Sequence, residues 1–275
     1  MLKLSRVFEY VIINNVLLKV EHIIDRRHNK MKIAVFSDIH GNIEALNRVM
    51  EDIKREDVDK IYCLGDLVGY GPYPNEVIDV IRDNEIETVM GNYDQGVGFD
   101  LDDCGCAYKT KAKQKLGDRS LAWTQKEVTD QNKEFLKSLK ENIKFEAAGK
   151  KVLLVHGSPR KINQYLFFNH PAKSIKRMMD QYEADIMITG HTHLPYVKKI
   201  EDKIIINDGS VGKQKPFNKE QETYSTEAKY IIVEVDEGSV NTELRSLPYD
   251  YEKIARAIND SELPDEFAEI IRGRG

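Results

Sequence analysis

The sequence predicts an α/β fold built as one domain with two packed sheets. Strands and helices alternate between residues 32 and 92, a pattern typical of a parallel sheet. Closely spaced strands joined by short turns follow after residue 195, a pattern typical of antiparallel pairing. The chain has 275 residues, of which 41% are hydrophobic, so it is long enough to bury a substantial core.

The first expected elements begin with the segment KIAVF at residues 32–36. Its continuous apolar run is expected of a strand that is covered on both faces. Apolar residues then recur at helical spacing at Ile43, Leu46, Met50 and Ile53. Three further elements complete a β-α-β-α-β unit with parallel strands: a strand at 60–64, a helix at 74–81 and a strand at 86–90.

The second part of the chain changes in character. Residues 94–142 are expected to be irregular and then helical. A strand, a helix and a strand follow, at 151–155, 175–182 and 185–189. Four strands are expected to pair antiparallel, at 196–200, 203–207, 230–235 and 239–247. Two helices are expected to close the chain, at 251–258 and 264–272.

Residues 1–30 differ from the rest of the chain. The apolar stretch at 11–18 is interrupted by two asparagines and is followed by charged residues. It is much shorter than the roughly 20 apolar residues that a membrane span requires. We expect the functional protein to begin at Met31, with one domain over 31–275 and the preceding residues as an upstream extension. An amphipathic interaction helix is the alternative.

Composition and charge narrow the class of protein. A net charge of −5 argues against non-specific nucleic-acid binding. Three cysteines, an odd number, do not make a disulfide framework in a chain of this length, which indicates a reducing, cytoplasmic compartment. No apolar run approaches bilayer length, so no membrane partner is expected. A homo-oligomer is compatible with this composition.

Polar side chains that could bind a metal follow five of the apolar strands, each beside a glycine. They are Asp38 and His40 in DIHG, Asp66 in GD, Asn92 in GN, His156 in HG, and His191 and His193 in GHTH. Taken singly, each has a structural explanation as a helix cap, a turn residue or a buried histidine. However, strand ends in open α/β sheets are where ligands gather, and four of the seven histidines lie in these blocks. The whole pattern therefore predicts a metal site.

The order D-x-H, GD, GN, H and GHTH resembles the calcineurin-like metallophosphoesterase superfamily. The resemblance covers roughly residues 31–275, including NDGSVG at 207–212, and the spacing is similar to that of the YfcE-like group of prokaryotic phosphodiesterases. It implies the metallo-dependent phosphatase-like fold, a four-layer α-β-β-α sandwich of two mixed sheets flanked by helices. It also implies ligand sets for two metals: Asp38, His40 and His193 for one, Asn92, His156 and His191 for the other, and Asp66 bridging both.

Two divalent transition-metal ions are the cofactors that this ligand set implies. Imidazole, carboxylate and amide ligands together suit Mn, Fe, Zn, Co or Ni, with manganese as the first choice, rather than Mg or Ca. Two ions sharing Asp66 would lie roughly 3.5–4 Å apart. The expected reaction is hydrolysis of a P–O bond by attack of a metal-bound hydroxide, with a small phosphoester or a nucleotide as substrate. The expected activity is that of a phosphodiesterase.

The sequence departs from the family pattern at residue 93. Many members have GNH, whose histidine lies near the leaving-group oxygen, whereas this chain has GNY with Tyr93. The catalytic residues are therefore expected to be Asp38, Asp66, Asn92 and Tyr93, with Tyr93 serving mainly to shape the pocket. Asp208 stands where related sequences usually have proline, and is interpreted as a loop variation.

Several alternatives stay open on the sequence alone. The same metals would also serve a phosphomonoesterase or a nucleotide pyrophosphohydrolase, and a non-catalytic metal-binding scaffold is a third possibility. Cys104 and Cys106 are interpreted as structural, with a redox pair or a metal clip as the alternatives. The basic run at 109–119 is interpreted as a solvated face. The alternative is contact with a nucleotide phosphate, helped by Lys213 and Lys215.

Overall fold

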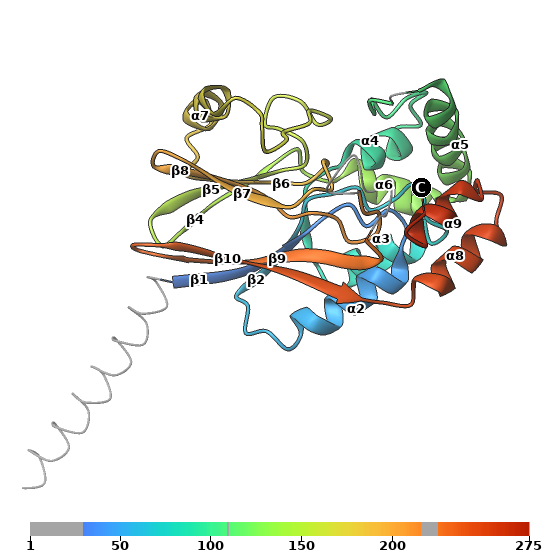
Figure 1. The fold of residues 1–275 in the computed structure, drawn as a ribbon, viewed down its shortest axis with the longest axis horizontal. Coiled ribbons are helices and arrows are strands. Elements are labelled where there is room, and N and C mark those ends of the chain that lie inside the picture. The colour runs from blue at the N-terminus through green and yellow to red at the C-terminus, as the bar shows by residue number, and fades with distance from the viewer. Residues whose placement is uncertain (1–29, 109, 216–224, 275) are drawn as a thin grey trace, which may run out of the picture.

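The computed structural model describes residues 30–108, 110–215 and 225–274, which form two five-stranded sheets packed face to face (Figure 1). The first sheet has the strand order β10-β9-β1-β2-β3 and the second has the order β4-β5-β6-β8-β7. Both contain parallel and antiparallel pairs. The predicted α/β fold of two mixed sheets is therefore confirmed. The predicted extension, apart from its last residue Lys30, lies outside the described residues.

The strands of the first sheet are β1 (Lys30–Phe36), β2 (Lys60–Cys63), β3 (Glu87–Thr88), β9 (Glu227–Asp236) and β10 (Val240–Pro248). Those of the second are β4 (Ile143–Ala147), β5 (Lys150–Val155), β6 (Ile186–Thr189), β7 (Tyr196–Ile200) and β8 (Lys203–Asn207). The described helices are α2 (Ile43–Ile53), α3 (Pro74–Asp83), α4 (Asn92–Gly98), α5 (Lys111–Glu127), α6 (Asp130–Lys137), α7 (Ala172–Gln181), α8 (Tyr251–Asn259) and α9 (Glu266–Ile271). Within the described ranges, no helix has the length and apolar character needed to cross a membrane.

Side-chain alternation along β1 explains the layers. Ile33 and Val35 pack between the two sheets, in a cluster that includes Val152 of β5. Ala34 and Phe36 lie on the opposite face of β1, in a cluster with apolar residues of α2 and α3. A third cluster joins the outer face of the second sheet to α7. The order α2, first sheet, second sheet, α7 is visible in Figure 1 and is the predicted four-layer sandwich.

The pairing of the later strands differs from the expectation of one antiparallel sheet. β7 and β8 pair with each other in the second sheet, where β8 is also parallel to β6. β9 and β10 pair with each other in the first sheet, where β9 is antiparallel to β1. Burial explains this division, because most of β9 is buried on both faces and fits a central position, whereas β10 is largely exposed and fits an edge.

The edge strand β4 was not predicted from the sequence. It pairs antiparallel with β5 and forms a hairpin with it. Its sequence IKFEA alternates apolar and charged residues, which is the signal that indicates a half-buried strand. The glycine at position 149 has a φ of +74°, which the tight turn of this hairpin requires.

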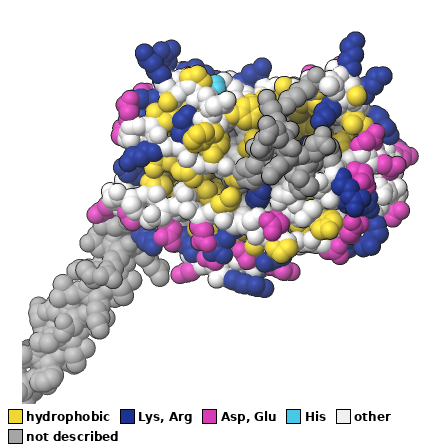
Figure 2. Space-filling view, viewed as in Figure 1, with side chains coloured by type: hydrophobic (Ala, Val, Ile, Leu, Met, Phe, Trp, Pro, Cys, Tyr) yellow, Lys and Arg dark blue, Asp and Glu magenta, His cyan; other side chains and the backbone are white. Residues whose placement is uncertain are grey.

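Charge on the surface is mixed. Acidic and basic side chains are interspersed across the described part of the face shown in Figure 2.

Candidate metal centre

The loops that follow β1, β2, β5 and β6 bring the predicted site residues together at one edge of the sandwich. Six of them form two groups of three, in each of which the possible ligand atoms lie within 4.8 Å of one another: Asp38, His40 and His193, and Asp66, His156 and His191. The groups meet at Asp66, whose Oδ2 lies 3.4 Å from His156 Nε2 and 3.7 Å from His40 Nε2. Apart from Asn92, these two groups contain the residues of the two ligand sets that the family resemblance implies.

The seventh residue, Asn92, belongs to the second group. It is the first residue of α4, and its Oδ1 lies 3.1 Å from His156 Nε2. All seven side chains are buried. Their role as metal ligands stays a prediction. The positions of their donor atoms show whether the residues present fit a metal ion.

Hydrogen bonds to the backbone orient the imidazoles of the first group and determine which nitrogen of each ring carries the proton. His40 Nδ1 lies 3.0 Å from the carbonyl oxygen of Val68, and His193 Nδ1 contacts the carbonyl oxygen of Lys213. A carbonyl oxygen only accepts, so each Nδ1 is the protonated nitrogen and each Nε2 keeps its lone pair. The two Nε2 atoms lie 3.3 Å apart. Two lone pairs at this separation repel each other, and a cation between them would turn the repulsion into attraction. The donor set therefore fits a metal ion.

In the second group, a backbone carbonyl orients one imidazole in the same way. His156 Nδ1 lies 2.7 Å from the carbonyl oxygen of Leu64, while its Nε2 lies 3.2 Å from His191 Nδ1. The buried Oδ1 of Asp38 and the buried Nε2 of His191 have no hydrogen-bond partner among the described residues. Buried polar atoms are normally hydrogen-bonded, so the unpartnered oxygen of Asp38 is further evidence that the first group fits a cation.

Burial and the neighbouring carboxylates shift the pKa values of the imidazoles, and so decide which of the rings are neutral. Burial lowers the pKa of His40 and of His191 to about 3, so both rings are neutral at neutral pH. Burial also opposes the charged form of His156, but the carboxylate of Asp66 outweighs it and raises the pKa of His156 to about 10. A metal ion beside Asp66 would displace that proton, because metal ligands must be deprotonated.

The backbone at this edge is strained. Five of the seven candidate ligands have φ values between +51° and +61°: Asp38, His40, Asp66, His191 and His193. This left-handed region is uncommon for residues other than glycine. Such strain persists only where surrounding contacts maintain it, and it concentrates at functional sites.

Two glycines let the loops after β2 and β3 touch. A methyl group at Gly91 would lie 2.2 Å from the backbone nitrogen of Asp66, and one at Gly65 would lie 2.3 Å from the backbone nitrogen of Gly91. Real Cβ atoms do not approach other atoms so closely, so these positions require glycine. The close contact places Asp66 beside Asn92.

Asp94 fastens the same two loops and was not among the predicted site residues. Its fully buried carboxylate accepts hydrogen bonds from the backbone N–H groups of Asp66 (2.8 Å), Leu67 (2.8 Å) and Gly91 (2.9 Å). The signal that could have found it is its position in GNYD, the third residue of α4, where a carboxylate caps a helix N-terminus.

Asp208, interpreted from the sequence as a loop variation, lies in the loop after β8, and this loop is buried. Asp208 itself is fully buried. Ser37 Oγ lies 2.9 Å from Asp208 Oδ1 and 2.6 Å from Asp38 Oδ2. Burial, followed by the charge of Asp38, raises the pKa of Asp208 well above its usual value. Asp208 therefore supports the Ser37 hydroxyl that holds Asp38.

Tyr93 lies in a group of aromatic rings against His40. Its ring centre lies 5.6 Å from that of His40 and 4.7 Å from that of Tyr70, and its hydroxyl lies 3.2 Å from the hydroxyl of Tyr108. Burial raises the pKa of Tyr93 well above its usual value. The backbone N–H of Tyr93 donates to Asp66 Oδ1 at 2.8 Å. The residue thus packs beside the first group, while its catalytic role stays a prediction.

Cys104 and Cys106 contact Asn92. The side-chain amide of Asn92 donates to the carbonyl oxygen of Cys104 at 3.0 Å and to Cys106 Sγ at 3.2 Å. These contacts fix which end of the amide faces the second group, because the remaining oxygen is the atom near His156. Both cysteines are free thiols, and this arrangement favours their interpretation as structural.

Two lysines, Lys213 and Lys215, lie over tyrosine rings that contact the candidate ligands. Lys213 Nζ is 4.1 Å from the ring centre of Tyr70, and burial lowers its pKa to about 8. Lys215 Nζ is 5.3 Å from the ring centre of Tyr165. The lysines at 111, 113 and 115 are exposed on α5, as expected of a solvated face, and Lys109 lies outside the described residues.

Known proteins resemble the chain in sequence. The family model of the calcineurin-like phosphoesterase superfamily domain matches residues 31–238. The uncharacterized protein MJ0912 of Methanocaldococcus jannaschii is 36% identical over 259 residues, which cover 87% of this chain and 97% of that protein. A probable metallophosphoesterase of Methanothermobacter thermautotrophicus is 34% identical over 66 residues, or 24% of this chain and 34% of that protein.

Solved structures share the fold. The metallophosphoesterase from Sphaerobacter thermophilus superposes with a TM-score of 0.66 at 23% identity, covering 88% of this chain and 98% of its own. The hypothetical protein PH1004 from Pyrococcus horikoshii superposes with a TM-score of 0.72 at 20% identity, covering 89% and 98%. At these identities the likeness establishes the arrangement of strands and helices.

Proposed function

Because the chain belongs to the calcineurin-like phosphoesterase superfamily, we propose that it is a dinuclear metal-dependent phosphodiesterase. The observation that carries the proposal is the convergence of two three-residue groups on one carboxylate, that of Asp66. A carboxylate shared in this way is typical of two-metal hydrolases. The choice of a diester rests on the similarity of the motif spacing to prokaryotic phosphodiesterases, and manganese is our first choice of metal.

The proposed ligand sets are those that the family resemblance implies: Asp38, His40 and His193 for one ion, Asn92, His156 and His191 for the other, and Asp66 for both. When bound, the ions would supply activation of water and neutralisation of the charge on the phosphate. The carbonyl oxygens of Val68 and Leu64 accept from the Nδ1–H groups of His40 and His156, so Nε2 is the nitrogen of each ring that is left to bind a metal. The Ser37 hydroxyl and the backbone N–H of His191 donate hydrogen bonds to Asp38 Oδ2, and Asp38 Oδ1 is left available for a metal.

A pair of substrates with the same leaving group tests this proposal. The protein is stripped of metal, reloaded with Mn²⁺ and assayed with bis(p-nitrophenyl) phosphate and p-nitrophenyl phosphate. We expect kcat/KM to be at least about tenfold higher for the diester, a difference of about 1.4 kcal/mol in transition-state stabilisation. A preference for the monoester would indicate a phosphomonoesterase. Two bound metals without turnover of either ester would indicate a scaffold.

Tyr93 is proposed to shape the pocket, so its hydroxyl should matter little when the leaving group is good. A general acid contributes roughly 10²–10⁴-fold to rate, but a tyrosine with an ordinary pKa of about 10 is a poor acid at neutral pH, and burial raises the pKa of Tyr93 further. We expect Tyr93→Phe to keep kcat for bis(p-nitrophenyl) phosphate within about threefold. In the parent protein, rates should rise steeply as the pKa of the leaving group falls.

The measurement is a rate series over aryl and alkyl phosphodiesters for the parent, Tyr93→Phe and Tyr93→His. Tyr62→Phe is the control, since it removes a tyrosine hydroxyl between the two sheets, where Tyr62 stacks on Phe145. A flat dependence in the parent together with about a hundredfold loss in Tyr93→Phe would show that Tyr93 is itself the acid.

A further inference from the structure

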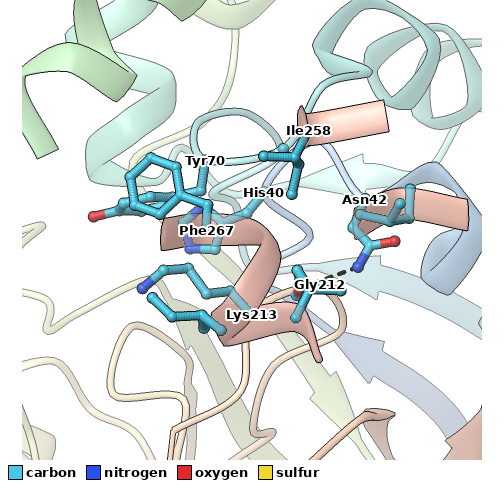
Figure 3. Close-up of a pocket in the computed structure, with 11 residues that line it drawn as sticks. His40, Asn42, Tyr70, Gly212, Lys213, Ile258 and Phe267 are labelled. Atoms are coloured by element: carbon cyan, nitrogen blue, oxygen red, sulfur yellow. Dashed lines mark hydrogen bonds between the residues drawn. The ribbon is translucent and has the colours of Figure 1, made fainter. Parts of the chain in front are cut away.

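The site is closed on the side of His40. The ring of Tyr70 lies 5.0 Å from that of His40, and Phe267 of α9 packs on Tyr70 at 5.1 Å. Figure 3 shows Phe267, Lys213, His40 and Tyr70 among the residues that line one cavity. The cavity among these residues and the inner faces of α8 and α9 has a volume of about 10 Å³. Such a volume holds about one water molecule, so no organic group of a substrate fits in this cavity.

The side of His191 is built differently. The ring of Tyr165 lies 4.1 Å from that of His191. The ring of Phe167 continues outward from Tyr165, at 5.5 Å and nearly parallel to it, with 7° between the planes. Phe167 is 39% exposed. Tyr165 and Phe167 therefore form an aromatic row that leads from a candidate metal ligand to the protein surface.

A positive charge beside this aromatic row indicates what the row binds. Lys215 Nζ lies 5.3 Å from the ring centre of Tyr165, which puts a positive charge beside the row. A nucleotide combines a planar base with a phosphate one sugar away. An exposed aromatic ring near a phosphate-binding centre and a lysine matches both parts.

We infer that the aromatic row of Tyr165 and Phe167 is a nucleobase subsite, and that the substrate is a nucleoside phosphodiester. The inference rests on the proposed function, because it takes the scissile phosphate to bind beside His191. Stacking of a base on an aromatic side chain contributes roughly five- to hundredfold in affinity and depends on the ring rather than on apolar area alone. Replacing Phe167 by leucine therefore removes the interaction while keeping an apolar side chain.

Two esters that share the p-nitrophenolate leaving group test the inference: the p-nitrophenyl ester of thymidine 5′-phosphate and methyl p-nitrophenyl phosphate. The Mn²⁺-loaded parent should have the lower KM for the thymidine ester. Phe167→Leu should raise the KM for the thymidine ester about tenfold relative to that for the methyl ester. Phe168→Leu is the matched control, because Phe168 is 59% exposed but packs against Tyr196 and Lys198 instead. It should leave the ratio unchanged.

The outcomes separate the inference from the function on which it rests. Turnover of both esters with equal KM in the parent, or an unchanged KM ratio in Phe167→Leu, would overturn the nucleobase subsite and leave the phosphodiesterase intact. An equal change of the ratio in Phe168→Leu would also overturn it, since the effect would not belong to the aromatic row. No turnover of either ester would overturn both the subsite and the proposed function.

Discussion

Asp66→Asn should lower kcat/KM for a phosphodiester by on the order of 10³-fold and should reduce the metal content below two ions per chain. Asp66 Oδ2 lies between His156 and His40, the two imidazoles that belong to different groups. The amide of asparagine keeps the shape of the side chain, and its oxygen still accepts from the N–H of Tyr93. Its NH₂ group, however, brings protons to the position where a carboxylate would bridge two cations, so the pairing of ions is lost.

The readouts for Asp66→Asn are metal content after dialysis and turnover with added Mn²⁺. Asp180→Asn is the control, because it removes the charge of a half-exposed carboxylate on α7 that pairs with Lys176 and Lys203, far along the chain from the candidate ligands. It should keep two ions and normal turnover. If Asp66→Asn also kept two ions and near-normal turnover, Asp66 would not be the bridging residue.

Asp94→Ala should destabilise the fold strongly. It leaves three buried N–H groups without an acceptor, those of Asp66, Leu67 and Gly91. Each unsatisfied buried donor costs roughly 1–3 kcal/mol, so the free energy of unfolding should fall by at least about 3 kcal/mol. Removing a residue that orients metal ligands typically costs about 10–100-fold in metal affinity or activity, and loss of Asp94 should do so through Asp66.

Asp94→Asn separates the loss of the acceptor from the loss of charge. Its amide oxygen can still accept from the loop, so it should recover part of the stability that Asp94→Ala loses. The surface control is Asp79→Ala on α3, which removes a half-exposed ion pair with Arg82 and should cost no more than about 1 kcal/mol. Chemical denaturation and metal titration of the variants give both readouts. If Asp94→Ala had the free energy of unfolding and the metal affinity of the parent, Asp94 would not be the residue that holds the loops after β2 and β3 together.

The features that the sequence predicts well are those encoded locally. The apolar run of β1 and the polar residues at the strand ends are short patterns, and the rule that strand ends gather ligands joins them without knowledge of the loops. The division of the later hairpins between two sheets is not local, since β9 pairs with β1, which lies near the other end of the sequence. Hydrophobic alternation predicts that each strand exists but does not specify its partner.

The supporting residues of the site were missed for the same reason. Asp94 and Asp208 are buried carboxylates whose partners lie in other loops, so each resembles an ordinary turn residue in the sequence. Tyr165 contacts His191 because the loop after β5, which carries Tyr165, lies beside the loop after β6. Contacts of this kind depend on long-range packing, which periodicity does not report.

Electron paramagnetic resonance of the Mn²⁺-loaded protein tests most directly whether two ions share Asp66. Two Mn²⁺ ions joined by one carboxylate are magnetically coupled, and their spectrum differs from that of isolated ions. We predict two Mn²⁺ per chain with a coupled spectrum in the parent, and loss of the coupling in Asp66→Asn. A single ion per chain in the parent, or two ions that give only the spectrum of isolated Mn²⁺, would contradict the dinuclear centre.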